Sequence, residues 1–288
     1  MPSAADTACV PSFAELQRDL PAFSPRALWF GALAAASRAG ALLSEGLRVG
    51  HRHGFDSGPF MAHVYDNQPR GRTALGRQID RRLLARRTCQ AFREIRQLAS
   101  GALEEAVAAS DAPGPVIADL AAGPAPYLFE VLARHPDAIA IVGDIDPAAL
   151  GLARRCAARL GVGDRVTFVQ GSAFDRSALA ALEQPPNVVA ELGLYGIYHD
   201  DRLIERHFLD LADTLAPAQI VFNVQTQNPE IEHIARVWRD HRGERCVWRL
   251  RPVETILGWA AAAGYQPASL RSDSHGIYRV GRLVKVPS

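Results

Sequence analysis

Hydrophobic and polar positions follow a helical period over the first part of the chain. Apolar side chains such as Ile79, Leu83 and Phe92 recur near helical spacing, with polar residues between them. This pattern predicts three helices, over residues 12–20, 28–47 and 77–110. Residues 53–72 combine turn formers with aromatic side chains, so we expect an ordered segment there rather than a linker.

The period changes after the turn-forming sequence SDAPGP at residues 110–115. Short apolar runs then alternate with helical patterns, which is typical of a mainly parallel sheet with helices on both faces. We expect seven strands, which start at Val116, Ile139, Arg165, Asn187, Gln219, Pro267 and Tyr278. Helices are expected between them, over residues 127–134, 147–160, 177–182, 200–215 and 253–263. Because only SDSHGI separates the last two strands, we predict that they form an antiparallel hairpin.

The change of pattern divides the chain into two predicted domains. Residues 1–110 are expected to form a helical cap, and residues 111–288 an α/β, Rossmann-like domain. A length of 288 residues suits one large domain with such an attachment. The apolar stretch of residues 27–43 is interrupted by Arg38, so a packed helix is expected there rather than a membrane span.

Charge and cysteine content narrow the expected partners. The net charge of +1 indicates no general attraction to nucleic acid or to a membrane. Residues 26–96 hold thirteen arginines against five carboxylates. Because the aromatic residues of this range do not alternate with the charges in a base-stacking pattern, a solvated helix surface is favoured over a nucleic-acid interface. The four cysteines, which lack metal-ligand or redox spacing, are Cys9, Cys89, Cys156 and Cys246. We therefore expect a reduced, cytoplasmic protein without structural disulfide or metal. A separate expectation is that the protein is a monomer or a homodimer.

The order of the strands suggests a ligand site. In an open α/β sheet, ligands bind beyond the carboxyl ends of the strands. The first strand ends near Asp119, and the turn AAGPA follows it with side chains small enough for close backbone approach. The second strand ends at Asp144, whose carboxylate can accept both hydroxyls of a ribose. The third ends in GSAFD, where Ser172 and the amide of Ala173 can meet an adenine ring.

The turn after the first strand resembles the first motif of the class I S-adenosylmethionine (SAM) dependent methyltransferases. That motif is an acid followed by Gly-x-Gly-x-Gly. Here Asp119 is followed by Ala121, Gly123 and Ala125 at the three glycine places. Alanine keeps the turn small but does not readily adopt a positive φ, so we expect a turn of slightly different shape.

The resemblance implies a cofactor and a set of contacts. It implies SAM as cofactor and a seven-stranded methyltransferase fold over residues 111–288. Asp119 lies where a carboxylate reaches a positively charged ligand group, and Asp144, with Ile145 beside it, takes the ribose role. Ser172 stands where the family has an acid, which leaves Asp175 as a substitute at the adenine.

The predicted cap carries a second resemblance. It is similar to a bacterial group of methyltransferases in which a segment of the type S-G-x-x-x-x-x-V-Y-x-N-x-P-x-G, then an I-D-R stretch, precedes the SAM domain. The matching residues are Ser57, Gly58, Val64, Tyr65, Asn67, Pro69, Gly71, Ile79, Asp80 and Arg81. We expect this part of the cap to close over the cofactor and exclude water. An aromatic face stabilises a cation by about 0.5–2 kcal/mol, so Tyr65 is a candidate for contact with the sulfonium.

Acceptor-side residues are expected after the fourth and fifth strands. The candidates are Glu191 for the cofactor and Tyr195, Tyr198, His199 and Asn223 for catalysis. Tyr195 is a second candidate for contact with the sulfonium. Each also has a purely structural interpretation: the tyrosines as half-buried aromatics, His199 as the neighbour of a helix N-cap, and Asn223 as a partner of turn backbone. The sequence leaves open whether His199 or a tyrosine handles a proton.

Three functions fit these features. The first is methyl transfer to a small molecule, in secondary metabolism. The second is different chemistry on the same cofactor, either transfer of its aminocarboxypropyl arm or cyclisation of SAM to azetidine-2-carboxylate and methylthioadenosine, with SAM itself as the only substrate. The third is SAM binding without catalysis, because fold alone does not settle function.

Overall fold

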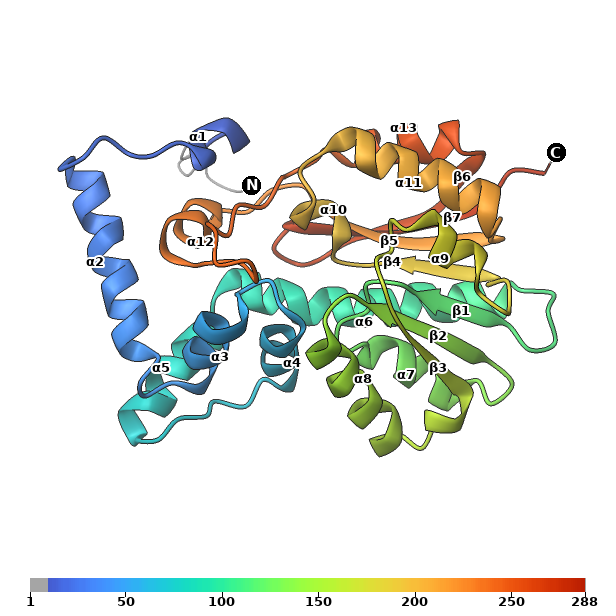
Figure 1. Ribbon diagram of the computed structural model, residues 1–288, viewed down its shortest axis with the longest axis horizontal. Coiled ribbons are helices and arrows are strands. Elements are labelled where there is room, and N and C mark those ends of the chain that lie inside the picture. The colour runs from blue at the N-terminus through green and yellow to red at the C-terminus, as the bar shows by residue number, and fades with distance from the viewer. Residues whose placement is uncertain (1–9, 288) are drawn as a thin grey trace.

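Seven strands form one sheet in the computed structural model, which describes residues 10–287 (Figure 1). The strand order is β3-β2-β1-β4-β5-β7-β6, and neighbours pair in parallel except β7, which is antiparallel to both β5 and β6. The strands are β1 (Val116–Asp119), β2 (Ile139–Asp144), β3 (Val166–Gln170), β4 (Val188–Glu191), β5 (Gln219–Gln225), β6 (Tyr265–Ser272) and β7 (Tyr278–Lys285). The predicted seven-stranded, Rossmann-like methyltransferase fold and its antiparallel C-terminal hairpin are confirmed.

Helices cover both faces of this sheet (Figure 1). On one face lie α6 (Arg87–Ala108), α7 (Pro126–Arg134) and α8 (Pro147–Arg159); on the other lie α9 (Arg176–Ala180), α11 (Asp201–Thr214) and α13 (Val253–Ala262). Two short elements complete the domain, the 3₁₀ turn η1 (Gly163–Arg165) and the one-turn α10 (Leu194–Ile197). Successive side chains of a strand point to opposite faces, so Ile117 joins one hydrophobic core and Ala118 the other.

Five N-terminal helices form the cap at one end of the sheet (Figure 1). They are α1 (Phe13–Gln17), α2 (Pro25–Gly40), α3 (Glu45–His53), α4 (Gly58–Asp66) and α5 (Ala74–Leu84). Helix α12 (Ile231–Val237), from the segment between β5 and α13, lies against α1 and α2. Phe55 and Phe60 of the cap belong to the same hydrophobic cluster as Ile117 of the sheet, so the cap is packed onto the sheet rather than tethered to it.

The predicted N-terminal helices differ from those observed. The helix expected over residues 28–47 ends at Gly40, because Ser44 is a buried N-cap that starts α3: its hydroxyl accepts from the Leu47 amide. The helix expected over residues 77–110 is two helices, α5 and α6. Arg86 between them has an extended backbone, and Thr88 at the start of α6 is held by Glu230 from a distant segment. Helices α4 and α12 were not predicted.

A buried carboxylate holds the cap helices together. Asp80 of α5 accepts hydrogen bonds from the Ser44 hydroxyl at 2.6 Å, the Gly46 amide at 2.7 Å and the Arg70 amide at 2.8 Å, and lies 2.9 Å from Nε2 of His63. These donors come from α3, α4 and the loop before α5. Asp80 belongs to the I-D-R stretch on which the second sequence resemblance rests, and in the structure its carboxylate joins these three segments of the cap.

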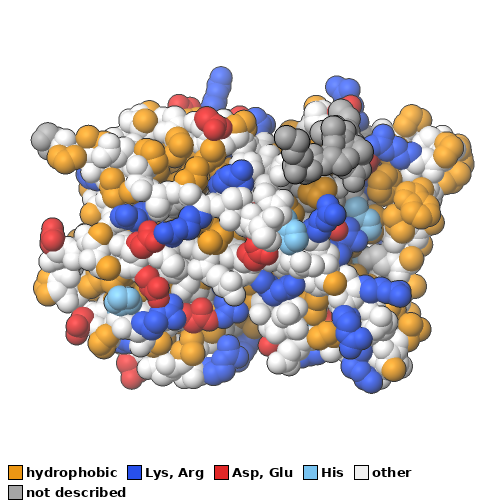
Figure 2. Space-filling view, turned by 180° about the vertical axis from the view of Figure 1, so that it is seen from behind, with side chains coloured by type: hydrophobic (Ala, Val, Ile, Leu, Met, Phe, Trp, Pro, Cys, Tyr) orange, Lys and Arg blue, Asp and Glu red, His pale blue; other side chains and the backbone are white. Residues whose placement is uncertain are grey.

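The end of the molecule formed by α2 exposes apolar side chains. None of the residues of α2 is fully buried; Trp29 is 62% exposed, and Phe23, just before the helix, is 87% exposed. Figure 2 shows hydrophobic side chains gathered at this end. Within residues 10–287, no helix has the length and apolar character needed to cross a bilayer. Cys9 lies outside the described residues, whereas Cys89, Cys156 and Cys246 are buried free thiols.

Candidate active site

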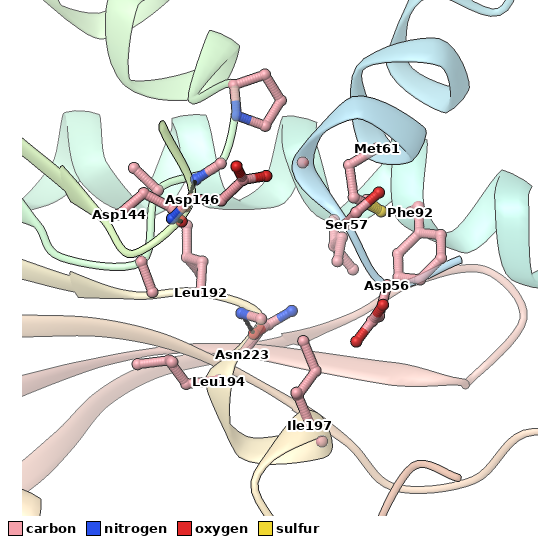
Figure 3. Close-up of a pocket in the computed structure, with 18 of the residues that line it drawn as sticks. Asp56, Ser57, Met61, Phe92, Asp144, Asp146, Leu192, Leu194, Ile197 and Asn223 are labelled. Atoms are coloured by element: carbon pink, nitrogen blue, oxygen red, sulfur yellow. Dashed lines mark hydrogen bonds between the residues drawn. The ribbon is translucent and has the colours of Figure 1, made fainter. Parts of the chain in front are cut away.

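A cavity of about 450 Å³ lies between the cap and the carboxyl ends of the parallel strands. Its wall is formed by α3, α4 and α6 of the N-terminal region, by the turns after β1, β2 and β4, and by the segment that follows α12. Figure 3 shows Asp144 and Asp146 on one side, Asp56, Met61 and Phe92 on the other. Ligand pockets of this size, largely apolar with a few polar groups, are usual for small molecules and cofactors.

The turn after β1 forms part of the cavity wall and contains two residues with a left-handed backbone conformation. Gly123 has φ +57° and Ala125 has φ +44°, so Ala125 adopts the conformation that a glycine would take more easily. The Ala125 methyl group is fully buried, and its residue is the N-cap of α7. A Cβ built on Gly58 of the cap would lie 3.5 Å from the Gly123 Cα, so α4 packs closely over the turn.

Asp119, at the end of β1, lies below this turn. Its carboxylate is fully buried and accepts a hydrogen bond from the Tyr127 hydroxyl at 2.6 Å. Burial and the nearby charge of Glu191 raise the pKa of Asp119 to about 7, although the Tyr127 bond acts in the opposite direction. Tyr127 lines the cavity, whereas Asp119 stands behind it. A protonated and an ionised Asp119 therefore coexist near neutral pH.

Asp144, at the end of β2, lines the cavity together with Ile145 and Asp146. Its carboxylate accepts from the Gly123 amide at 2.9 Å and from the Asp146 amide at 2.8 Å, which orients it between the first and second turns. Burial raises the pKa of Asp144, and these backbone bonds partly offset the rise. Ile145 is exposed beside it and offers an apolar surface.

Three further predicted cofactor contacts, Ser172, Ala173 and Glu191, lie outside the cavity wall. The Ser172 hydroxyl accepts from the Phe174 amide at 3.2 Å, and Ala173 is buried in the core. Glu191 is fully buried, with its Oε2 2.9 Å from Nε2 of His207. Burial alone lowers the pKa of His207, but the charge and hydrogen bond of Glu191 raise it above its ordinary value.

The acceptor-side candidates are divided between the cavity and its surroundings. Tyr198 and Asn223 line the cavity, and the Asn223 Oδ1 accepts from the Gly193 amide at 2.7 Å. Tyr195 is 1% exposed and packs in the core between Phe208 and Phe222.

His199 also lies outside the cavity wall. Its Nε2 is 2.7 Å from the Val247 carbonyl, and its ring packs edge-on against Phe13 at 4.8 Å. Burial lowers the pKa of His199, while the bond to Val247 acts in the opposite direction. The proposed catalytic roles of Tyr195 and His199 stay predictions: His199 has structural partners, whereas the buried Tyr195 hydroxyl has no hydrogen-bond partner among residues 10–287.

A buried arginine holds the loop that follows β4. The Arg251 guanidinium donates to the carbonyl oxygens of Tyr195 and Tyr198, the latter at 2.9 Å, and to Asp201 at 2.9 Å. The Arg249 amide donates to the Gly196 carbonyl at 2.9 Å. The backbone of this loop is therefore fixed from the segment before α13, a contact for which the sequence offers no local signal.

The cap contributes residues on the opposite side of the cavity. Tyr65, the predicted sulfonium contact, lines the cavity, and the Arg96 guanidinium lies 5.8 Å from its ring centre. Asp56 and His241 also line the cavity, although they were not predicted. No group of three or more His, Cys, Asp or Glu side chains suited to a metal ion occurs within residues 10–287.

The residues present fit SAM. The cavity brings together Ala121 and Gly123 of the small-residue turn, the oriented carboxylate of Asp144, and the apolar side chain of Ile145. These groups suit, in the same order, a close backbone approach, a ribose diol and an adenine ring. Tyr65 stands on the side of the cap.

Comparisons with known proteins place the chain in a methyltransferase family. A family described as "Putative methyltransferase" matches residues 4–285. The chain belongs to this family. Its seven-stranded sheet is the fold of the class I SAM-dependent methyltransferases, so the family and the fold agree with a site that fits SAM.

The methyltransferase is also similar to a longer curated protein and to a solved structure. The uncharacterized protein YnbC of Escherichia coli (strain K12) is 32% identical over 251 residues, which cover 84% of this chain and 42% of that protein. The chain thus spans less than half the length of this curated relative. A structure from Bordetella parapertussis, described as a possible exported protein, has a TM-score of 0.67 at 17% identity and covers 92% of this chain and all of that one.

A second solved structure shares the fold of this methyltransferase. It is the magnesium protoporphyrin IX methyltransferase ChlM from Synechocystis PCC 6803 with bound SAH. The TM-score is 0.54 at 18% identity, over 80% of this chain and 96% of that one. At these identities the likeness concerns the fold alone.

Proposed function

We propose that this methyltransferase transfers the methyl group of SAM to a small molecule held inside the cavity. The observation that carries the proposal is the position of the cap over the cavity: α4 packs on the turn after β1 through Gly58 and Gly123, and α3 supplies further wall beside α6 of the sheet domain. An acceptor attached to a large polymer has to reach past this cap, whereas a small molecule is not restricted in this way.

The residues of the chain have distinct roles in this proposal. When bound, SAM supplies an electrophilic methyl group on a sulfonium. Asp144 accepts hydrogen bonds from the ribose hydroxyls, Asp119 and Tyr127 stand on the side of the amino-acid tail, and Tyr65 faces the sulfonium. The cap excludes water, and the fixed loop after β4 orients the acceptor, since orientation can supply about 7–11 kcal/mol of a barrier.

A two-stage experiment tests the proposal. Calorimetry with SAM and with S-adenosylhomocysteine (SAH) measures cofactor binding. Mass spectrometry then follows SAH formation with a small-metabolite fraction of a cell extract, and separately with its protein and nucleic-acid fractions. SAH that forms only with the small-metabolite fraction supports the proposal; SAH that forms only with a macromolecular fraction contradicts it.

The same measurement separates the other uses of the cofactor. Methylthioadenosine and azetidine-2-carboxylate formed from SAM in the absence of any acceptor would identify cyclisation, whereas methylthioadenosine formed only with an added acceptor would identify transfer of the aminocarboxypropyl arm. Binding without turnover under every condition would identify a non-catalytic protein. The expectations of secondary metabolism, a cytoplasmic location and a monomer or homodimer rest on the sequence and stay predictions.

A further inference from the structure

The cavity wall contains a carboxylate–imidazole pair built from two distant segments. Asp56 lies in the loop between α3 and α4, and His241 follows α12. Asp56 Oδ1 accepts from the His241 backbone amide at 2.8 Å, and its Oδ2 lies 2.7 Å from His241 Nδ1. The Asp56 side chain is 2% exposed and that of His241 is 39% exposed, so the carboxylate is buried behind an accessible ring.

The two segments are held firmly against each other. The Phe55 ring stacks on Trp238 with centroids 4.4 Å apart, and the Phe55 amide donates to the Arg239 carbonyl at 3.0 Å. At Gly54, which has φ +97°, a Cβ would lie 2.3 Å from the His241 backbone nitrogen. Because the backbones are in direct contact, the pair is positioned before any ligand enters.

This geometry selects the tautomer of the neutral ring, and the hydrogen bond with Asp56 also raises the pKa of His241. A carboxylate at Nδ1 holds the proton on that nitrogen, so the neutral imidazole presents the lone pair of Nε2. We propose that His241 is the general base of the methyl transfer, that Asp56 is its positioning residue, and that the acceptor is an aromatic hydroxyl compound. The inference rests on the proposed function and names the substrate class of the same site.

The wall of the cavity favours an aromatic acceptor. Phe92, Trp248 and Tyr278 are buried and adjacent, with centroid distances of 5.8 Å and 5.7 Å from Phe92 to the other two. Gln225 donates to the Tyr278 hydroxyl at 3.0 Å, and its Oε1 is buried without a partner among residues 10–287. A buried carbonyl without a partner is unfavourable, and a donor group on the acceptor would pair with it.

The chemical step balances with these groups. The acceptor oxygen forms a bond to the methyl carbon while the carbon–sulfur bond breaks and sulfur keeps the electron pair. The hydroxyl proton moves to Nε2 of His241 and then to solvent. The products are an aryl methyl ether, SAH and one proton, and no oxidant or reductant is required.

Two phenols of different acidity test the base. In mildly alkaline buffer 4-nitrophenol is largely ionised and needs no base, whereas 4-methylphenol keeps its proton. The two test variants are His241→Asn and Asp56→Asn; the asparagine amide at position 241 retains a donor toward Asp56. The control is His135→Asn at the end of α7. SAH formation, SAM affinity and Tm are measured for each.

We expect the wild type to methylate both phenols. His241→Asn should lose on the order of 10²-fold in rate with 4-methylphenol and far less with 4-nitrophenol, while its SAM affinity and Tm match the wild type. Asp56→Asn should follow the same pattern. The rates, SAM affinity and Tm of His135→Asn should equal those of the wild type. Equal losses with both phenols, or no SAH with either phenol while SAM still binds, would overturn the inference. Absence of SAM binding would instead overturn the proposed function on which it rests.

Discussion

The Tyr127 hydroxyl donates to the Asp119 carboxylate at 2.6 Å, in a fully buried pair directly behind the cavity. Because the pKa of Asp119 is raised to about 7, its native state binds a proton that the unfolded state releases near pH 4. Its stabilising contribution is present below about pH 4 and is lost as the pH rises through 7. Asp119→Asn keeps an acceptor for Tyr127. We expect this variant to lose the decrease in the free energy of unfolding between about pH 4 and pH 7, measured by urea unfolding.

The same variant separates folding from cofactor binding. At neutral pH Asp119→Asn should change the free energy of unfolding by less than about 1 kcal/mol, because the carboxyl is already partly protonated there. If the carboxylate serves the amino group of SAM, calorimetry should show weaker SAM binding. An unchanged SAM affinity would remove Asp119 from the cofactor site.

Asp144 is expected to dominate recognition of the ribose. Asp144→Asn loses charge-assisted hydrogen bonds, which are worth about 1.5–3 kcal/mol, so SAM affinity should fall about 10- to 100-fold. Calorimetry with SAM and SAH measures this. Asp164→Asn, the same change at the exposed 3₁₀ turn, is the control and should bind SAM as the wild type does. Equal affinities for the two variants would contradict the assignment.

Asp80 is expected to carry much of the stability of the cap. Removing a buried carboxylate with several donors costs about 3–5 kcal/mol, so Asp80→Ala should lower the free energy of unfolding by that amount. The exposed Asp66, paired with Arg70, is the control, and Asp66→Ala should cost less than about 1 kcal/mol. Chemical denaturation distinguishes the two; similar costs would count against the role of Asp80.

The stability supplied by Asp80 should also depend on pH. Burial alone raises the pKa of Asp80, but the hydrogen bonds from His63 and Ser44 and from the Arg70 amide hold it below its ordinary value. Its contribution is therefore present above about pH 4 and is lost as the pH falls through the lowered pKa. Asp80→Ala should flatten this acid limb of the stability profile.

The left-handed backbone at Ala125 predicts unequal effects of two similar substitutions. Ala122→Gly and Ala125→Gly each remove one buried methyl group, worth about 0.8 kcal/mol. Only Ala125 has a positive φ, whose cost for an L-residue is about 1–2 kcal/mol and is relieved by glycine. Ala125→Gly should therefore be about 1–2 kcal/mol more stable than Ala122→Gly in denaturant unfolding. Equal stabilities would show that the turn is not strained.

Arg251 is expected to act on turnover through the loop after β4. Lysine cannot reproduce the fork that joins two carbonyl groups and Asp201, so Arg251→Lys should raise hydrogen exchange of the amides in residues 195–201. SAH formation should slow by about 10-fold or more, while SAM affinity changes little. The exposed Arg202→Lys is the control. Unchanged exchange in the loop would contradict the positioning role.

The sheet was predictable from the sequence because each strand is a short apolar run bounded by turn formers. The strand at Val116 and the acids at Asp119 and Asp144 follow directly from this pattern. Helix α4 was missed because its aromatic and small residues resemble a loop, although Ser57 followed by Gly58 and Pro59 is an N-terminal helix signal.

Features that depend on distant segments were not predictable. The break before α6 coincides with contacts of Thr88 to Glu230, 142 positions away. Asp56 and His241 are 185 positions apart, and neither lies in a recognisable motif. Tertiary packing brings such residues together, and the spacing of residues within one segment does not predict contacts with a distant segment.

The contact between the N-terminal helices and α12 affects the order in which the nascent chain can fold. Arg236 donates to the carbonyl oxygens of Glu15 and Arg18, and α12 packs against α2. On the ribosome, α1 emerges long before Arg236, so this contact forms only after a further 218 residues beyond Arg18 have been synthesised. Fragments cut near residue 110 would lack that contact, so the two parts of the chain should be expressed together for biochemical work.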